Sequence, residues 1–255
     1  MKVLLVGAGP GAADLMTMRA ARAVQGAEAL LYDALVCAEV LAMAPERCLR
    51  ICTGKRAGKA SMKQETINRL MLRLARRGLR VVRLKGGDPS VFGRCGEERD
   101  FLEAHGVEVE VVPGVTTASA AAAQFGFPLT HRGEARRLLL ATARTLDGGL
   151  ADGWREAADG ETTVALYMAG QSAAMVAARL IAEGRAPSTP ALAVENAGRR
   201  EARLIRCDLA TLGQAVSDAA FDGPVLLLIG AVAAHAREIG ASELTSPSMP
   251  ASACR

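Results

Sequence analysis

A buried strand that runs into a glycine-rich turn opens the chain and constrains its fold class. Residues 2–6 read KVLLV, residues 7–12 read GAGPGA, and apolar residues at mostly helical spacing follow over 12–26. A second apolar strand over 28–32 ends at Asp33. A strand, a tight turn, a helix and a second strand form the start of a parallel sheet covered by helices. The opening segment therefore predicts an α/β domain.

The same alternation of strands and helices continues along the chain and predicts an α/β fold with a largely parallel sheet. Further strands are predicted over 48–52, 79–84, 107–112, 136–142, 162–168, 190–195, 202–206 and 224–232. Further helices are predicted over 37–44, 62–77, 96–104, 116–125, 172–183 and 209–219, the helix over 62–77 with a capping box of Ser61 and Gln64.

The composition changes near residue 115, where a small-residue helix, TTASAAAAQF, begins. We expect an N-terminal α/β domain over 1–114 and a C-terminal α/β domain over 115–240. The segment over 241–255 is rich in Ser, Pro and Ala, which predicts a disordered tail.

The first glycine-rich turn matches the dinucleotide fingerprint GxGxxA, and Asp33 stands about 20 residues further on, where a ribose-binding acid is expected. On this pattern alone an NAD-dependent oxidoreductase is a fair hypothesis. Pro10 argues against it, because proline has no N–H to donate to a pyrophosphate. The turn then exposes its backbone to an uncharged or cationic ligand, or it serves only the close packing of strand and helix.

A second glycine-rich loop is more informative. It reads RLKGGDPSVFGRCGEE over 83–98, and its strand runs directly into Gly86, Gly87 and Asp88. Ligands bind at the carboxyl ends of strands in open α/β sheets, so these residues are candidates for a binding site. Arg94 and Glu97 lie one helical turn apart, either as functional groups or as an ordinary surface ion pair.

Two later loops add candidates. In PGVTT, Thr116 and Thr117 either cap the following helix or offer hydroxyls to a ligand. In PLTHRG, His131 is a possible base, although a lone histidine is more often structural.

Charge and composition exclude several classes. The net charge is +4, with 26 Arg and 5 Lys, and aromatic residues make up 3%. A nucleic-acid surface built on stacked bases needs more aromatic residues. A mild positive charge suits a small acidic substrate, and some arginines are expected to form planar forks for carboxylates.

Cysteine usage and the apolar runs predict a cytoplasmic protein. Six cysteines without CxxC or zinc spacing indicate a reducing compartment. The first apolar run is a better strand than a signal peptide, and no run reaches the length of about 20 residues that a membrane span needs.

Eight motifs occur in an order that resembles a known family: GAGPGAADLMTMRA, LYDALV, GKRAG, LKGGDPSVFGRCGEE, VVPGVTTASAAAA, PLTHRG, YMAG and VENAG. Together they resemble the uroporphyrinogen-III C-methyltransferases, which are S-adenosylmethionine (SAM)-dependent enzymes of the tetrapyrrole methyltransferases. The resemblance covers about residues 2–235. It implies two α/β domains with a SAM-binding cleft between them, and a homodimer. It also implies that the first glycine turn is not a dinucleotide site.

The resemblance carries roles onto individual residues. The implied cofactor contacts are Pro10, Gly86, Gly87, Asp88, Val91, Thr116, Thr117, Met168 and Ala197, where Ala197 replaces a usual glycine. The residues implied in proton transfer are Asp33, Lys55, Arg94 and Glu97, and those implied in substrate binding are Arg94, Arg132 and Met168. Departures from the family pattern at Ala60, Cys95, Ala143 and Arg144 leave the cofactor loops intact.

The implied reaction transfers methyl groups from SAM to C2 and C7 of uroporphyrinogen III, through precorrin-1 to precorrin-2. It releases two S-adenosylhomocysteine and leads toward sirohaem, haem d1 or cobalamin. Electron-rich pyrrole carbons attack the sulfonium methyl directly, so the protein must position the reactants and remove a proton, and we expect no metal. The alternatives are another precorrin-type methyltransferase and a non-catalytic module that binds SAM or a tetrapyrrole. Neither a nucleic acid nor a membrane is an expected partner.

Overall fold

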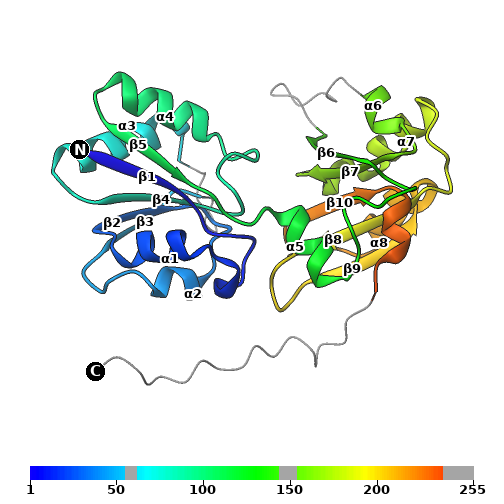
Figure 1. The fold of residues 1–255 in the computed structure, drawn as a ribbon, viewed down its shortest axis with the longest axis horizontal. Coiled ribbons are helices and arrows are strands. Elements are labelled where there is room, and N and C mark those ends of the chain that lie inside the picture. Colours follow the sequence, from blue (N-terminus) through cyan, green and yellow to red (C-terminus); the bar gives the residue numbers. More distant parts are fainter. Residues whose placement is uncertain (55–61, 144–153, 238–255) are drawn as a thin grey trace.

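The chain folds into two lobes, each built around a five-stranded sheet (Figure 1). The structure is a computed structural model that describes residues 1–54, 62–143 and 154–237. The first lobe contains the described residues up to 112, and the second lobe contains those from 117 to 237. The segment 113–116 joins them. The predicted α/β class with two α/β units is confirmed.

All neighbouring strands of the first sheet are parallel, in the order β3-β2-β4-β1-β5. The strands are β1 (Lys2–Gly7), β2 (Ala29–Tyr32), β3 (Leu49–Cys52), β4 (Val81–Lys85) and β5 (Glu108–Val112). The helices of this lobe are α1 (Met18–Gln25), α2 (Ala38–Ala42), α3 (Gln64–Arg76) and α4 (Cys95–Ala104), preceded by the 3-10 turn η1 (Ala13–Leu15).

Alternating side chains of the first sheet bury two opposite apolar faces. Val3 and Leu5 of β1 lie in the cluster formed with α3 and α4. Leu30 and Val82 lie in the other cluster, which is formed with α1 and α2. Figure 1 shows these two helix pairs on opposite sides of the sheet. Because both faces are covered, the carboxyl ends of the strands remain as the place for a site.

The second sheet has the order β6-β7-β10-β8-β9. Its strands are β6 (Arg137–Thr142), β7 (Thr162–Tyr167), β8 (Pro190–Glu195), β9 (Arg203–Asp208) and β10 (Val225–Ile229). The helices are α5 (Thr117–Gln124), α6 (Trp154–Ala158), α7 (Ala173–Ala182) and α8 (Leu212–Asp218), with 3-10 turns η2 (Gly170–Ser172), η3 (Leu209–Thr211) and η4 (Ala231–His235).

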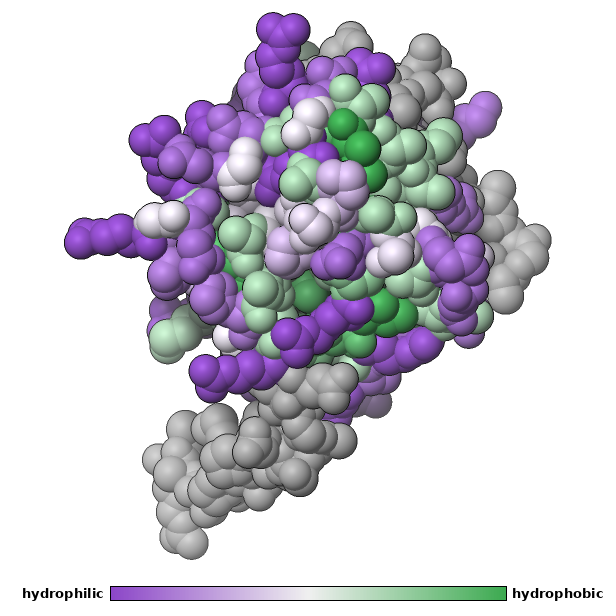
Figure 2. Space-filling view, turned by 90° about the vertical axis from the view of Figure 1, so that its right-hand side faces the viewer, coloured by the Kyte–Doolittle hydropathy of each residue, from purple (hydrophilic) through white to green (hydrophobic). Residues whose placement is uncertain are grey.

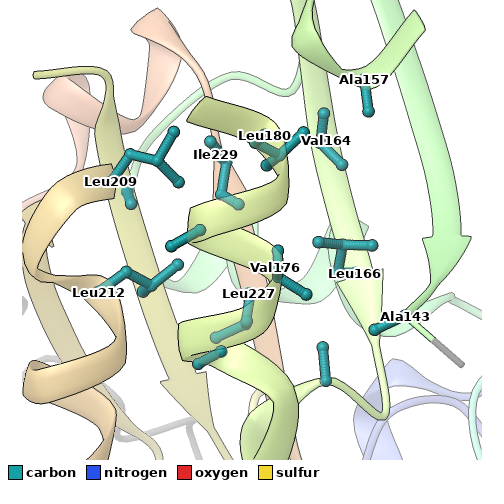
Figure 3. Close-up of a cluster of buried hydrophobic side chains, with 14 of the residues drawn as sticks. Ala143, Ala157, Val164, Leu166, Val176, Leu180, Leu209, Leu212, Leu227 and Ile229 are labelled. Carbon is teal, nitrogen blue, oxygen red and sulfur yellow. The ribbon is translucent and has the colours of Figure 1, made fainter. Parts of the chain in front are cut away.

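The core of the second lobe also has two layers. On one face of the sheet, Val176 and Leu180 of α7 point toward Val164, Leu166 and other strand side chains (Figure 3). On the opposite face, alanines of α5 and η4 form a second cluster with Phe125. The N-terminus of α5 lies beside the end of β7, where the N–H of Ala118 donates to the hydroxyl of Tyr167 at 3.1 Å.

The prediction of a largely parallel sheet is wrong for this lobe. Only β6 and β7 pair in parallel, whereas β10 is antiparallel to β7 and β8, and β8 is antiparallel to β9. Residues 196–202 between β8 and β9 are too few for the crossover of about a dozen or more residues that a parallel pair requires. Alternation of apolar residues predicts a strand but not its direction.

The predicted elements are found with small shifts. The helix predicted over 12–26 is divided into η1 and α1, because the Thr17 hydroxyl accepts the N–H of Ala20 at 3.1 Å and caps a new helix. Helix α3 begins at Gln64, and Ser61 of the predicted capping box lies outside the described residues. Helix α6 was not predicted. The tail over 241–255 also lies outside the described residues.

Within residues 1–54, 62–143 and 154–237, no helix combines the length and apolar character needed to cross a membrane. The five cysteines in the same ranges are free thiols.

Candidate functional site

A cavity of about 520 Å³ opens between the two lobes. From the first lobe, Asp33 follows β2 and Gly86 follows β4 at the carboxyl edge of the parallel sheet. From the second lobe, Met168 follows β7 and Asn196 follows β8. The volume lies within the range of about 300–1,000 Å³ that is usual for small-molecule sites. The cavity is therefore the candidate site.

The cavity wall collects most of the site residues that the sequence predicts. Those that line it are Pro10, Asp33, Gly86, Gly87, Asp88, Val91, Arg94, Thr116, Thr117, Met168 and Ala197. Glu97 and Arg132 are not among the lining residues, and Lys55 lies outside the described residues.

The first glycine turn is occupied by protein contacts. The N–H groups of Ala8, Gly9 and Ala12 donate to the carbonyls of Lys85, Gly87 and Gly198 at 2.8, 3.2 and 2.8 Å. A pyrophosphate would need such donors free. The interpretation of this turn as a dinucleotide site is thus wrong, and so is the notion of a backbone exposed to a ligand at these three donors.

Its glycines serve close packing between segments. A Cβ on Gly11 would lie 2.3 Å from Cγ of Arg199, and one on Gly7 would lie 2.7 Å from Cα of Gly114. Of this turn, Pro10 alone lines the cavity. The turn thus holds the two lobes together and presents one apolar ring to the site.

Two aspartates fix the second glycine loop. Asp33 accepts the N–H of Leu35 at 3.0 Å through Oδ1 and the N–H of Gly86 at 3.1 Å through Oδ2. Asp88 accepts the N–H of Ser90 at 2.8 Å and, through Oδ2, the N–H of Gly114 at 2.9 Å; its Oδ1 also accepts the Ser90 hydroxyl. These carboxylates join the loop after β4 to its neighbours.

Residues of the two lobes meet across the cavity at Tyr167. Its hydroxyl lies 2.6 Å from Oγ1 of Thr116 and accepts the N–H of Ala118 at 3.1 Å, which satisfies a free donor at the start of α5. Its ring lies 5.1 Å from the ring of Phe92, which belongs to the first lobe. The hydroxyl of Thr116 thus forms a hydrogen bond with the hydroxyl of Tyr167 and does not itself cap α5.

Left-handed backbone is concentrated at the cavity. Among the described residues, five that are not glycine have positive φ, and four of them line the cavity: Phe92 (54°), Arg94 (58°), Met168 (56°) and Asn196 (53°). Such conformations cost about 1–3 kcal/mol each and persist where the surrounding structure imposes them, which is typical of functional sites.

A buried charge cluster, formed by Arg83, Lys85, Glu98 and Gln64, lies at the cavity wall. Glu98 is fully buried and accepts from Nε of Arg83 at 3.1 Å, from Nζ of Lys85 at 2.9 Å and from Nε2 of Gln64 at 3.0 Å. Arg83, Lys85 and Gln64 line the cavity. Burial and then the charge of Arg83 lower the pKa of Lys85, while Glu98 opposes that shift. Two cations beside one carboxylate leave this wall positively charged.

Arg94 and Glu97 form the ion pair that their spacing predicts. Nε of Arg94 donates to Oε1 of Glu97 at 2.8 Å and Nη2 donates to Oε2 at 2.7 Å. Both side chains are more than half exposed. The hydrogen bond to Glu97 raises the pKa of Arg94, and the same bond lowers the pKa of Glu97. Arg94 therefore stays charged at the edge of the cavity, and its Nε–Nη2 edge is occupied by Glu97.

Two residues of the PLTHRG loop lie away from the cavity. Arg132 and His131 are exposed and do not line it. Nδ1 of His131 lies 3.6 Å from a carboxylate oxygen of Glu134.

Sequence reasoning missed several residues of the wall. They are Gln64, Arg83, Lys85, Phe92, Tyr167, Asn196 and Arg199. Lys85 and Arg83 stand in the strand that enters the GGD loop, so their spacing along that strand was an available signal. No sequence signal pointed to Arg199. Its Nη2 donates to the carbonyl of Leu35 in the other lobe at 2.8 Å, and its buried Nε has no hydrogen-bond partner among the described residues.

Two α/β lobes that meet at a cavity lined by glycine loops, hydroxyls and cations match the arrangement expected of a tetrapyrrole methyltransferase. Residues 2–213 match the model of the tetrapyrrole (corrin/porphyrin) methylases, and the chain belongs to this family. The predicted SAM-dependent methyltransferase class and the resemblance to the uroporphyrinogen-III C-methyltransferases are confirmed.

Among solved structures, the chain is similar to uroporphyrin-III C-methyltransferase from Thermus thermophilus complexed with S-adenyl homocysteine. The identity is 40%, the TM-score is 0.78, and the match covers 91% of this chain and 93% of that one. It is also similar to a cobalt precorrin-4 methyltransferase, with 28% identity, a TM-score of 0.81, and coverage of 90% and 94%.

Among curated proteins, the siroheme synthase of Methylococcus capsulatus is 44% identical over 231 residues, which cover 90% of this chain and 49% of that protein. The siroheme synthase of Xylella fastidiosa is 43% identical over 252 residues, which cover 98% and 53%. The chain thus spans about half the length of these curated relatives.

Proposed function

We propose that this protein transfers methyl groups from SAM to C2 and C7 of uroporphyrinogen III, giving precorrin-1 and then precorrin-2 with two S-adenosylhomocysteine. One observation carries the proposal. The cavity between the lobes gathers the predicted cofactor residues of both lobes beside a wall of arginine and lysine side chains. The part of the cavity lined by small neutral residues suits the nucleoside of SAM. The part lined by arginine and lysine suits a substrate that carries many carboxylates.

The residues present fit SAM. Pro10, Val91 and Ala197 give apolar wall, while Asp33 and Thr117 give polar atoms. SAM supplies a methyl group on a cationic sulfonium, ready for in-line attack. The task left to this chain is to hold donor and acceptor in line and to keep water out.

The cationic wall is proposed to bind the substrate carboxylates. Arg94 lines the cavity with Nε and Nη2 on Glu97, so a substrate carboxylate would bind its Nη1 and the second N–H of Nη2 or replace Glu97 on the fork, while Lys85 adds a point charge. Arg199 also lines the cavity and adds a cation from the second lobe. Arg132 and Met168 remain proposed substrate contacts, Met168 as a residue of the cavity wall.

Asp33 is proposed as the proton acceptor. Its carboxylate lines the cavity and is held by two backbone N–H groups. Glu97 is engaged by Arg94 and does not line the cavity, and the raised pKa of Arg94 makes it a poor base. Lys55, the other candidate, lies outside the described residues.

The proposal includes a homodimer in a reducing, cytoplasmic environment and a reaction that uses no metal. Met175 of α7 is 48% exposed. Figure 2 shows green and white side chains interspersed with hydrophilic ones in the middle of the outer face of the second lobe, while hydrophilic side chains prevail toward its edge. Light scattering should give twice the chain mass of 26.5 kDa, and a mass near 26.5 kDa at low concentration would count against the dimer.

A second candidate is another precorrin methyltransferase, because the TM-score of 0.81 to the cobalt precorrin-4 methyltransferase slightly exceeds the 0.78 to the uroporphyrin-III enzyme. Fold similarity therefore does not distinguish the two functions. Sequence identity favours the uroporphyrin-III enzyme, at 40% against 28% for the cobalt precorrin-4 methyltransferase.

The test is an anaerobic assay with SAM and enzymatically made uroporphyrinogen III, followed by visible absorption and mass spectrometry. The expected product is coloured and carries two added methyl groups, with two S-adenosylhomocysteine released per product. Binding of SAM without turnover would support the non-catalytic module, and methylation of a later precorrin alone would support the second candidate.

A further inference from the structure

Two histidines that are far apart in sequence converge on one glutamate outside the cavity. The chain has three histidines, and two of them, His131 and His235, both lie next to Glu134. Nδ1 of His131 lies 3.6 Å from Oε1 of Glu134, while Nε2 of His235 lies 3.1 and 2.8 Å from its two oxygens. The two imidazole rings lie 5.3 Å apart at an angle of 26°. One ligand atom from each residue falls within 4.8 Å of the others.

A tight turn positions the first two of these side chains. His131 and Ala135 exchange backbone hydrogen bonds, each with a length of 2.9 Å. Gly133 has a φ of 87°, which closes the turn in a conformation that favours glycine. His131 and Glu134 are therefore held on one short loop before any ligand binds.

The third side chain is positioned by the core. His235 ends η4, and the residues on either side of it are fixed: Ala233 and Ala236 are buried in the cluster with Phe125. The N–H of Arg237 donates to the carbonyl of Phe125 at 2.8 Å. His235 thus faces Glu134 from a segment that the core holds in place.

We propose that His131, Glu134 and His235 bind a divalent transition-metal ion, Zn²⁺, with water completing a tetrahedral site. Imidazole nitrogen and carboxylate oxygen are zinc ligands, and bonds of about 2.0–2.1 Å set tetrahedral ligand atoms about 3.3 Å apart. The two separations between a histidine nitrogen and Glu134, 3.6 and 2.8 Å, lie on both sides of that value, and the two histidine nitrogens lie within 4.8 Å of each other. Zn²⁺ binds the lone pair of a neutral imidazole, so the bound His235 carries its ring proton on Nδ1, and the contact between Nε2 and the Glu134 carboxylate is replaced by one metal bond from each residue.

The site is separate from the methyl-transfer cavity, since none of its three residues lines that cavity. The metal would tie the loop 128–135, which carries Arg132, to the segment 231–237. Its role is therefore to fix this loop, and the proposal does not rest on the proposed function. Spacing along the sequence gave no signal, because the two histidines lie 235 − 131 = 104 residues apart.

The test uses the purified full chain freed of metal by chelation, titrated with Zn²⁺ by calorimetry. Matched variants are His235→Ala, Glu134→Gln and the control His105→Ala, which changes the remaining histidine. We expect one Zn²⁺ per chain in the wild type and in the control, with affinity lowered about tenfold or more in both cluster variants. Zn²⁺ should also raise the Tm of the wild type and the control but not of the cluster variants.

Co²⁺ gives an independent signature, because cysteine ligands add an intense near-ultraviolet thiolate band that imidazole and carboxylate lack. We expect a tetrahedral visible spectrum without that band. Equal Zn²⁺ affinity in the wild type and His235→Ala, a thiolate band, or no saturable binding to the wild type would each overturn the proposal. The histidines and the glutamate would then form a hydrogen-bonded cluster only.

Discussion

The ring of Phe92 lies 5.1 Å from the ring of Tyr167, and this pair joins the two lobes across the cavity. Phe92 comes from the loop after β4, with a φ of 54°, while Tyr167 ends β7 and satisfies the first turn of α5 through its hydroxyl. The loop after β4 in one lobe and the start of α5 in the other thus meet through Tyr167. This junction adds to the hydrogen bonds of Ala12 with Gly198 and of Arg199 with Leu35, which also join the lobes.

Tyr167→Phe tests the hydroxyl and keeps the ring. The change leaves the buried Ala118 N–H and the Thr116 hydroxyl without the Tyr167 hydroxyl as partner, so the free energy of unfolding should fall by about 1–2 kcal/mol. Urea denaturation measures it, and SAM affinity should fall with it. Phe92→Leu, which leaves both hydroxyl bonds in place, is the control and should cost less stability. Equal stability of Tyr167→Phe and wild type would show that the hydroxyl does not hold this junction.

Asp88→Ala tests the second glycine loop. The change removes acceptors for the N–H groups of Ser90 and Gly114, so the loop loses its link to the segment between the lobes. Hydrogen bonds to charged groups contribute about 1.5–3 kcal/mol, so SAM affinity should fall about tenfold or more. Calorimetry measures it, with the exposed Asp100→Ala as control. Unchanged affinity would remove Asp88 from the site.

Arg94→Lys separates a substrate clamp from a surface ion pair. Lysine keeps the charge but loses the planar fork, so SAM binding should be retained while turnover falls about tenfold or more. Arg69→Lys, which changes an exposed arginine paired with Glu65, is the control and should change neither quantity. Near-wild-type formation of precorrin-2 by Arg94→Lys would contradict the clamp.

Glu98→Gln tests the buried charge cluster. Removal of the carboxylate leaves Arg83 and Lys85 as unpaired buried cations, so the free energy of unfolding should fall by about 3–5 kcal/mol. Glu103→Gln, an exposed change on the same helix, should have little effect. Adding Lys85→Met to Glu98→Gln should restore part of the loss, since one unpaired charge disappears. No recovery in the double variant would contradict this explanation.

The same variant has a defined pH dependence. Burial and Arg83 already lower the pKa of Lys85 from 10.5, and without Glu98 only the more weakly acting Asp33 opposes them. Between the lowered pKa of the folded chain and 10.5 the unfolded chain then binds more protons than the folded chain, so the free energy of unfolding rises with pH in that window. Denaturation between about pH 7 and 9 should show a steeper rise for Glu98→Gln than for wild type. If the free energy of unfolding of Glu98→Gln, relative to wild type, stayed constant or fell with pH, Lys85 would not titrate as proposed.

The first lobe could be predicted almost completely from sequence, because each buried strand is followed by a turn and an amphipathic helix. In the second sheet, the short 196–202 connection was an available signal for the antiparallel pairing of β8 with β9. The antiparallel pairing of β10 with β7 and β8 depends on tertiary packing and could not be predicted. Helix α6 was missed, although Trp154 is buried. These differences arise where tertiary packing and connection length decide the structure.

The candidate site divides in the same way. Gly86, Asp88 and Thr116 stand in recognisable loops and meet at the cavity. Glu98 reads as one more surface acid in GEERD, and its burial follows only from the packing of α4 on the sheet. The family resemblance points instead to Glu97, one residue earlier, whose side chain is exposed.

The most direct test of the account is a crystal structure of the protein grown with S-adenosylhomocysteine. We expect the ligand in the cavity between the lobes, in contact with the loop of Gly86, Gly87 and Asp88 and with Thr116 or Thr117. Ligand density outside this cavity, or no density at a concentration shown by calorimetry to saturate binding, would contradict the central claim that the cavity between the lobes is the methyl-donor site.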